Sequence, residues 1–144
     1  MPIEPEATAA PVYVVGDNWL AIIVAAIAIY AIGFIIYGAV FSGLWMKLSG
    51  YTKEQLQPHM WKMAISWVMP ILTSIGLALV LKSAGVTNLA AGLVVTFQIW
   101  FFLILSTRLY SFVYSPEKPG LLVMDAIHLL LGFMAAGAII SAWP

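Results

Sequence analysis

Residues 18–46 read NWLAIIVAAIAIYAIGFIIYGAVFSGLWM and contain no charged side chain. A helix that crosses a bilayer needs about 20 consecutive, mostly apolar residues, so this stretch is long enough for one crossing and too short for two. Three more uncharged runs follow, and each again allows one crossing; they cover residues 63–81, 83–107 and 126–144. The sequence therefore predicts a single domain over 18–144 with transmembrane helices at about 18–41, 61–82, 88–112 and 120–142.

The composition agrees with a protein that lives in a membrane. Of the 144 residues, 63% are hydrophobic and 8% are charged, whereas soluble domains carry about 25% charged residues. The formal net charge is zero, so no field attracts nucleic acid. Because cysteine is absent, disulfide scaffolds, thiolate metal sites and cysteine nucleophiles are excluded. A β-barrel would show alternating polarity, which these runs lack, so we expect an all-α integral membrane four-helix bundle.

Local signals mark several helix ends. Asn18 and Asn88 precede the first and third helices and can cap them. Gly85 follows the second helix and suits a left-handed C-terminal position. The longest connection covers residues 42–60. Inside it, Thr52 and Gln55 form a capping-box pattern that predicts a short interfacial helix, and Pro58 suits the first turn of helix two.

Basic residues predict the orientation, because cytoplasmic loops carry an excess of lysine and arginine. Five of them flank the connection 42–60 or the loop 113–119, and only one lies at the other end. The five are Lys47, Lys53, Lys62, Arg108 and Lys118, and the single one is Lys82. Both termini are therefore expected outside, with residues 1–17 as an extended extracytoplasmic tail whose segment 13–15 rests at the membrane surface.

Two ionisable residues are expected at membrane depth, where charge is costly. Arg108 lies about one turn from the loop end of helix three, and Asp125 about one turn into helix four. The tight loop between these helices places both residues at similar depth, so an ion pair is geometrically natural. Three interpretations remain open for them: a structural clamp, an Arg108 that snorkels to phosphate headgroups, or a role in proton or ion movement.

His128 follows Asp125 by three residues and shares its helix face. Three alternatives are open. The two side chains form a hydrogen-bonded packing group, or they form a proton relay or anion site beside Arg108. In the third alternative, His128 ligates the metal of haem or chlorophyll. A second histidine at similar depth is absent, because His59 lies in the connection before helix two.

Helix two carries Lys62, Ser66, Pro70 and Thr73 along one face. Pro70 removes one helical hydrogen bond and frees the carbonyl of Ser66. The predicted kink either forms a small polar pocket or is an ordinary proline kink packed by neighbours.

Small residues allow helices to approach closely in a membrane. Ala21, Ala25 and Gly33 lie along helix one, while helix four carries the pairs Gly132–Ala136 and Gly137–Ser141. These positions predict either packing within the chain or association with other membrane proteins or a second copy. Trp100 lies near the middle of helix three, away from the interfaces, and indicates a protein contact or a lipid-facing surface.

Several motifs resemble those of an uncharacterised bacterial family of small four-span membrane proteins, a family of unknown function. They are Asn18-Trp19-Leu20-Ala21, Gly33, Tyr37-Gly38, the run Trp45–Thr52, His128-Leu129-Leu130, Gly137, Ile139-Ile140 and Trp143. Members often carry Ser-Pro after the tyrosine of the first helix, where this chain has Gly38-Ala39. The resemblance implies the four-span fold and a bacterial cytoplasmic membrane location, and it implies no activity.

No residue pattern indicates catalysis: a nucleophile with a matching base, a phosphate-binding glycine loop and a metal-spaced cluster are all missing. We therefore expect a non-enzymatic accessory or structural subunit, surrounded by membrane lipids and packed against a larger membrane complex such as an electron-transfer or photosynthetic one. The alternative is a small transporter or channel that uses Arg108, Asp125 and His128. A weaker alternative is a pigment- or haem-binding protein that uses His128.

Overall fold

The computed structural model describes residues 15–143. This part of the chain is helical and contains no strand. Four helices are long and apolar enough to cross a membrane, which confirms the predicted number: Trp19–Val40, Trp61–Ser83, Leu89–Val113 and Pro119–Ala142. Residues 1–14 of the predicted tail, including Tyr13 and Val14, lie outside the described residues.

The first span changes its helical form half-way. Helix α1 (Trp19–Gly33) begins at Asn18, whose side chain accepts a hydrogen bond of 3.0 Å from the N–H of Leu20, as predicted. A π-helix, η1 (Phe34–Val40), completes the span. It closes with the N–H of Phe41 on the carbonyl of Ile36, five residues earlier. The chain continues into α2 (Ser42–Ser49).

The connection between the first two spans contains the predicted short helix. Gly50 ends α2 with a φ of +77°, and α3 (Lys53–Leu56) begins at Thr52 with both hydrogen bonds of the capping box to Gln55. Hydrogen bonds to the Glu54 carboxylate lower its pKa; the larger effect comes from the backbone N–H of Glu54 and the smaller one from the Thr52 hydroxyl. Pro58 lies in a separate 3₁₀ turn, η2 (Gln57–His59), so its predicted place in the first turn of helix two is wrong.

The second span consists of two helices, α4 (Trp61–Ile65) and α5 (Val68–Ser83). The helix is interrupted at Ser66 and Trp67, one turn before Pro70, because a proline has no N–H to donate to the carbonyl four residues earlier. The ring of Trp67 stacks on Tyr30 of α1, with centroids 3.8 Å apart. Gly85 follows the span with a φ of +67°, which confirms the predicted left-handed residue.

The third span runs through α6 (Leu89–Ile99), a second π-helix η3 (Trp100–Ile104) and α7 (Leu105–Val113). Asn88 caps it by accepting a hydrogen bond of 2.9 Å from the N–H of Ala91, as predicted. Trp100 is 9% exposed, so it makes a protein contact and does not face lipid.

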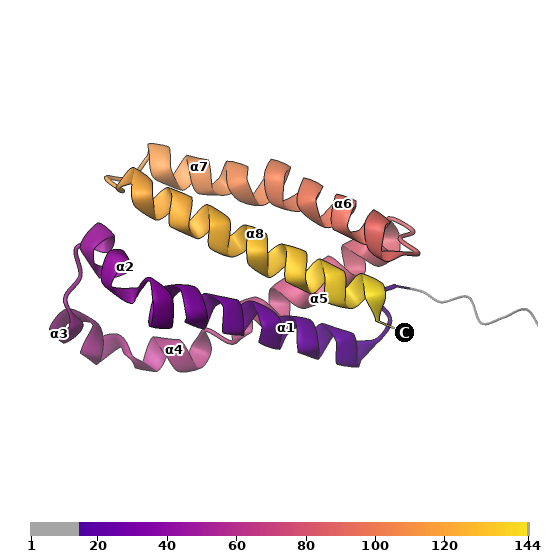
Figure 1. Cartoon of the computed structure of the whole chain (residues 1–144), viewed down its shortest axis with the longest axis horizontal. Coiled ribbons are helices and arrows are strands. Elements are labelled where there is room, and N and C mark those ends of the chain that lie inside the picture. Colours follow the sequence, from indigo (N-terminus) through magenta and orange to yellow (C-terminus); the bar gives the residue numbers. More distant parts are fainter. Residues whose placement is uncertain (1–14, 144) are drawn as a thin grey trace, which may run out of the picture.

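Helix α8 (Pro119–Ala142) forms the fourth span and begins at Pro119, one residue before the predicted start at about 120. It lies between α1 on one side and the α6–α7 arm on the other, while α5 crosses behind (Figure 1). Two faces of α8 are therefore buried. One presents Ala136 and Ile140 to the core beside Ala25 and Leu77.

The second buried face of α8 packs very closely on α6. A methyl group on Gly92 would lie 2.5 Å from Cβ of Ser141, and one on Gly137 would lie 2.9 Å from Cβ of Thr96. Each helix thus places a glycine opposite a small hydroxyl side chain of the other. Because no heavier side chain fits, these four residues set the distance between the two helices.

The segment before α1, residues 15–17, packs against α5. Val15 is 1% exposed and belongs to the core, so the expectation that it rests at the membrane surface is wrong. Gly16, with a φ of +91°, runs so close to α5 that a Cβ atom would lie 2.4 Å from the carbonyl oxygen of Ala78. Asp17 then pairs with Lys82. The close backbone approach lets Val15 reach the core.

We expect Gly16→Ala to lower the free energy of unfolding by about 2–5 kcal/mol, because left-handed strain of about 1–2 kcal/mol adds to overpacking of about 1–3 kcal/mol. Gly85→Ala is the matched control, since Gly85 also has a positive φ and meets open space. Unfolding curves in detergent micelles compare the two variants. Equal destabilisation would contradict the close approach of Gly16 to α5.

Candidate functional site

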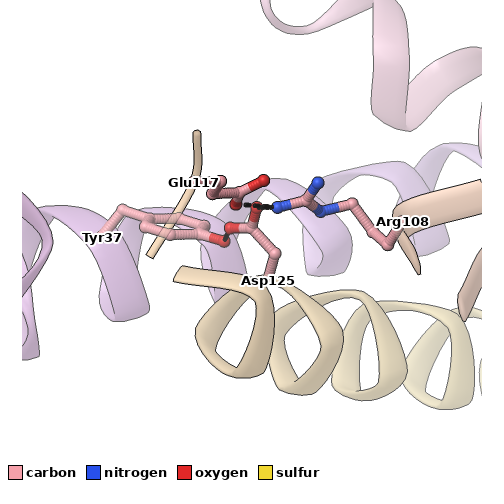
Figure 2. A network of polar contacts seen from close by, with 4 residues as sticks. All are labelled: Tyr37, Arg108, Glu117 and Asp125. Atoms are coloured by element: carbon pink, nitrogen blue, oxygen red, sulfur yellow. Dashed lines mark hydrogen bonds and ion pairs between the residues drawn. The ribbon is translucent and has the colours of Figure 1, made fainter. Parts of the chain in front are cut away.

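Four polar side chains, from η1, α7, α8 and the loop between α7 and α8, meet in one cluster (Figure 2). The Nη2 atom of Arg108, on α7, donates to Oδ2 of Asp125, on α8, over 2.7 Å. The same nitrogen donates to Oε1 of Glu117, in the loop between these helices. The hydroxyl of Tyr37, on η1, donates to Oδ1 of Asp125. We call these four residues the Arg108 cluster.

The Arg108 cluster is largely withdrawn from solvent. The side chains of Arg108, Glu117 and Asp125 are 18%, 16% and 26% exposed. Ion pairs in such surroundings are screened little, and loss of one partner leaves the other charge without compensation. Chemically, the arrangement can tie the first span to the third and fourth, and it can hold charge.

Local structure explains how the four side chains come together. The short loop makes α7 and α8 antiparallel neighbours, which brings Arg108 beside Asp125 at equal depth. Glu117 lies two residues before Pro119, where the chain turns back into α8. Tyr37 lies inside the π-helix η1. Such segments are frequent at functional sites.

His128 lies beside the Arg108 cluster, and its imidazole ring forms no hydrogen bond within residues 15–143. Its ring meets the ring of Tyr37 edge-on, with centroids 4.9 Å apart and an angle of 73°. Its Nε2 atom faces the first span, because a Cβ atom on Gly33 would lie 3.0 Å from it. The structure thus joins His128 to Asp125 through Tyr37.

The same contact decides whether His128 fits a haem or pigment. A ligating Nε2 needs open space for a macrocycle, and here this nitrogen lies against α1 at Gly33. The geometry therefore does not fit a cofactor on that atom. Within the described part of the chain, no three histidine, aspartate or glutamate side chains are grouped so that they could hold a metal ion.

The predicted kink residues of the second span have different surroundings. Pro70 is buried, Ser66 donates from its hydroxyl to the carbonyl of Met63 over 2.6 Å, and Lys62 is exposed. Thr73 lines a depression of about 240 Å³ between α5, α6 and α8. The remaining residues that line this depression are apolar: Leu72, Gly76, Leu77, Val80, Ile99 and Phe133.

The predicted small residues all lie at contacts inside the chain. Ala21, Ala25 and Ala136 are buried, and Gly33 faces His128. Gly132 lies opposite Ile29 of α1 at an ordinary contact distance. Gly137 and Ser141 face α6, as described above. Packing within the chain therefore accounts for these positions.

Sequence reasoning missed two members of the Arg108 cluster. Tyr37 follows Gly33 by one helical turn, so the sequence places both residues on one face of the helix. A tyrosine within a span, however, does not indicate which side chain its hydroxyl will bond. Glu117 lies in the loop 113–119, where an acidic side chain by itself indicates no partner. An acid nine residues after an intramembrane arginine, with a turn between them, is the signal that could have identified it.

Comparison with known protein families gives one match. The family described as a protein of unknown function, DUF1761, matches residues 20–141. The chain belongs to the DUF1761 family. This confirms the resemblance inferred from the sequence motifs, and the matched range contains the whole Arg108 cluster. No curated protein and no solved structure matches this DUF1761 chain.

In this DUF1761 protein, Tyr37→Phe removes one hydrogen bond to a charged group and leaves the ring in place. Such bonds contribute about 1.5–3 kcal/mol, so we expect a loss of about 2 kcal/mol in the free energy of unfolding. Tyr30→Phe is the matched control, because Tyr30 makes a stacking contact and its hydroxyl has no hydrogen bond within the described residues. Thermal unfolding in micelles measures both variants, and a neutral Tyr37→Phe would contradict the Tyr37–Asp125 bond.

Proposed function

We propose that this chain is a non-enzymatic accessory subunit that packs against a larger complex in the bacterial cytoplasmic membrane, such as an electron-transfer or photosynthetic complex. Four candidate spanning helices and the DUF1761 match support a membrane protein. The accessory role is supported by one observation: the rest of the chain leaves the outer face of the third span uncovered.

The third span is the least buried of the four, with 11% of its most apolar window buried inside the chain, against 28% for the second and fourth. Within the described residues it packs mainly on α8. Its outer face carries a succession of aromatic rings: Phe97 stacks on Phe101, and Phe102 meets Phe101 edge-on, with centroids 5.9 and 5.1 Å apart. Phe102 is 66% exposed.

An aromatic row of this kind supports a protein partner more than lipid. Lipid tails pack on aromatic rings no better than on other apolar side chains. Helices in membranes, in contrast, associate through complementary packing of their side chains. Rings that already support one another lose little conformational freedom on binding. We therefore propose the row of Phe97, Phe101 and Phe102 as the contact with a helix of the partner complex; bulk lipid and a second copy of the chain are the competing occupants.

Site-specific photocross-linking tests this proposal in native membranes. A photoreactive phenylalanine analogue at position 102 should yield one discrete adduct with a membrane protein, identified by mass spectrometry. The matched control places the analogue at Ile27, which is 49% exposed on α1. Adducts of equal yield at both positions, a dimer-sized adduct, or lipid adducts alone at 102 would overturn the accessory role.

The proposal includes an orientation with both termini outside. The connection before the second span and the loop before the fourth lie at one end with Lys47, Lys53 and Lys118, while Lys82 lies at the other. Because the chain lacks cysteine, single cysteines report sidedness cleanly. A membrane-impermeant maleimide should label Thr87→Cys in intact cells and leave Ser115→Cys unlabelled. The reverse labelling would place the termini inside.

A small transporter is the second candidate, because Arg108 and Asp125 pair at the edge of the membrane with His128 close by. Under this alternative, Asp125→Asn and His128→Ala should change solute or proton flux in proteoliposomes while the protein stays folded. Unchanged flux in both variants would remove this candidate.

A further inference from the structure

Four lysine side chains at one end of the spans form no ion pair among the described residues. They lie on the connection between the first two spans, at the start of α4 and just before α8, and all four are exposed: Lys47, Lys53, Lys62 and Lys118. Consecutive spans alternate in direction, so these segments share one end; Figure 1 shows α2, α3 and the turn from α7 to α8 together there. We call these four residues the lysine surface.

Contact between α2 and the start of α8 joins two parts of the lysine surface. The ammonium group of Lys118 donates to the backbone carbonyl of Lys47 over 3.1 Å. Gly120 lies against Leu48 of α2, because a Cβ atom on Gly120 would lie 2.9 Å from Cδ2 of Leu48. Lys47 and Lys118, 71 positions apart in the sequence, therefore belong to one continuous surface.

The structure leaves an excess of positive charge at this end. Arg108 is bonded to Glu117 and Asp125 inside the fold, so Glu54 is the one acid of the described residues that lies exposed near the lysine surface. Five basic and three acidic side chains at this end give a formal excess of two positive charges. At the other end of the described chain, Lys82 pairs with Asp17 and their charges cancel.

Aromatic side chains beside the lysine surface indicate its depth in a bilayer. Trp45 and Tyr51 stack with centroids 6.3 Å apart, and Lys47 lies between them in the sequence. Trp61 directly precedes Lys62 and is 61% exposed. Amphipathic rings of this kind prefer the level of the lipid headgroups. The long lysine side chains can therefore place their ammonium groups among the lipid phosphates.

We propose that the lysine surface binds the headgroups of anionic phospholipids. Such lipids carry a net negative charge that complements the surface, whereas zwitterionic headgroups have a phosphate but no net charge. A basic residue close to an anionic membrane surface strengthens binding by about fivefold. An acidic protein segment is the competing occupant, and headgroup depth favours the lipid because its phosphates already lie there. This inference is independent of the proposed accessory role.

Native mass spectrometry of the full-length protein tests this lipid preference. The protein is released from nanodiscs that contain equal amounts of phosphatidylglycerol and phosphatidylcholine with the same acyl chains. Wild type should retain phosphatidylglycerol over phosphatidylcholine by about fivefold. A quadruple variant with Lys47→Gln, Lys53→Gln, Lys62→Gln and Lys118→Gln should retain both lipids equally. The matched control, Asp17→Asn with Lys82→Gln, removes a cation and its acid at the other end and should keep the preference of wild type.

Ionic strength supplies a second test that needs no substitution. Salt screens charges that are exposed to water, and the screening length falls from about 10 Å at about 0.1 M to about 3 Å at about 1 M. Tryptophan quenching of wild type by brominated phosphatidylglycerol should weaken over this range, and quenching by brominated phosphatidylcholine should stay constant. Equal retention of the two lipids by wild type, a preference that survives in the quadruple variant, its loss in the control, or quenching that ignores salt would overturn the proposal.

Discussion

Replacing Arg108 with glutamine is expected to lower the free energy of unfolding by about 3 kcal/mol, toward the lower end of the roughly 3–5 kcal/mol measured when one partner of a buried ion pair is removed. The substitution leaves Glu117 and Asp125 beside each other without a cation. Chemical unfolding of the purified protein in mixed micelles, followed by tryptophan fluorescence, measures the loss.

The charge argument predicts a rescue. A triple variant with Arg108→Gln, Glu117→Gln and Asp125→Asn has no charged side chain in the cluster. It should therefore recover most of the stability that Arg108→Gln alone removes. Arg108→Lys keeps the charge but offers a single ammonium in place of a planar guanidinium, and we expect an intermediate loss. A triple variant as unstable as Arg108→Gln would mean that packing of the arginine side chain, and not its charge, holds this end of the bundle.

The second large effect is expected at the contact of α6 with α8. Gly92→Leu introduces a side chain where even a methyl group would lie 2.5 Å from Cβ of Ser141. Overpacking of a close contact costs about 1–3 kcal/mol and occasionally more, and we expect about 3 kcal/mol or a failure of the two helices to pack. Thermal unfolding in micelles again gives the measurement.

A glycine on a neighbouring span provides the control. Gly76 of α5 lies in the membrane-spanning part, and a methyl group on it would meet no atom within 4 Å, so Gly76→Leu should change stability little. The double variant Gly92→Ala with Ser141→Gly should be less destabilised than Gly92→Ala alone, because removal of the serine side chain makes room for the added methyl group. Equal effects of leucine at positions 76 and 92 would contradict the close helix contact.

The expected spans agreed with the structure because charges and caps act locally. A charged residue within the hydrocarbon region is costly and therefore rare, so long uncharged runs reveal the helices. Asn18, Asn88 and the pair Thr52–Gln55 bond to backbone only two or three residues away. Such signals need no knowledge of the fold, and the structure shows each of them where the sequence placed it.

The candidate site was partly accessible in the same way. Arg108 and Asp125 flank one tight loop, so hairpin geometry alone suggested their pairing. Tyr37 comes from a span 88 residues earlier than Asp125, and its direction depends on the π-helix η1. Val15 was misplaced for a related reason: an apolar residue before a span suits an interface or a core equally well, and the backbone approach of Gly16 to α5 decides between them.

The amino-acid sequence by itself determined four apolar helices, their ends and the scarcity of charge inside them, because hydrophobicity, capping and proline chemistry depend on near neighbours. Tertiary structure alone decided which small residues face α6 and which face α1, and that Glu117 joins the ion pair. It also decided that Tyr37 holds Asp125 while His128 packs on Tyr37. These contacts join residues from different spans, and only the packing of those spans brings them within bonding distance.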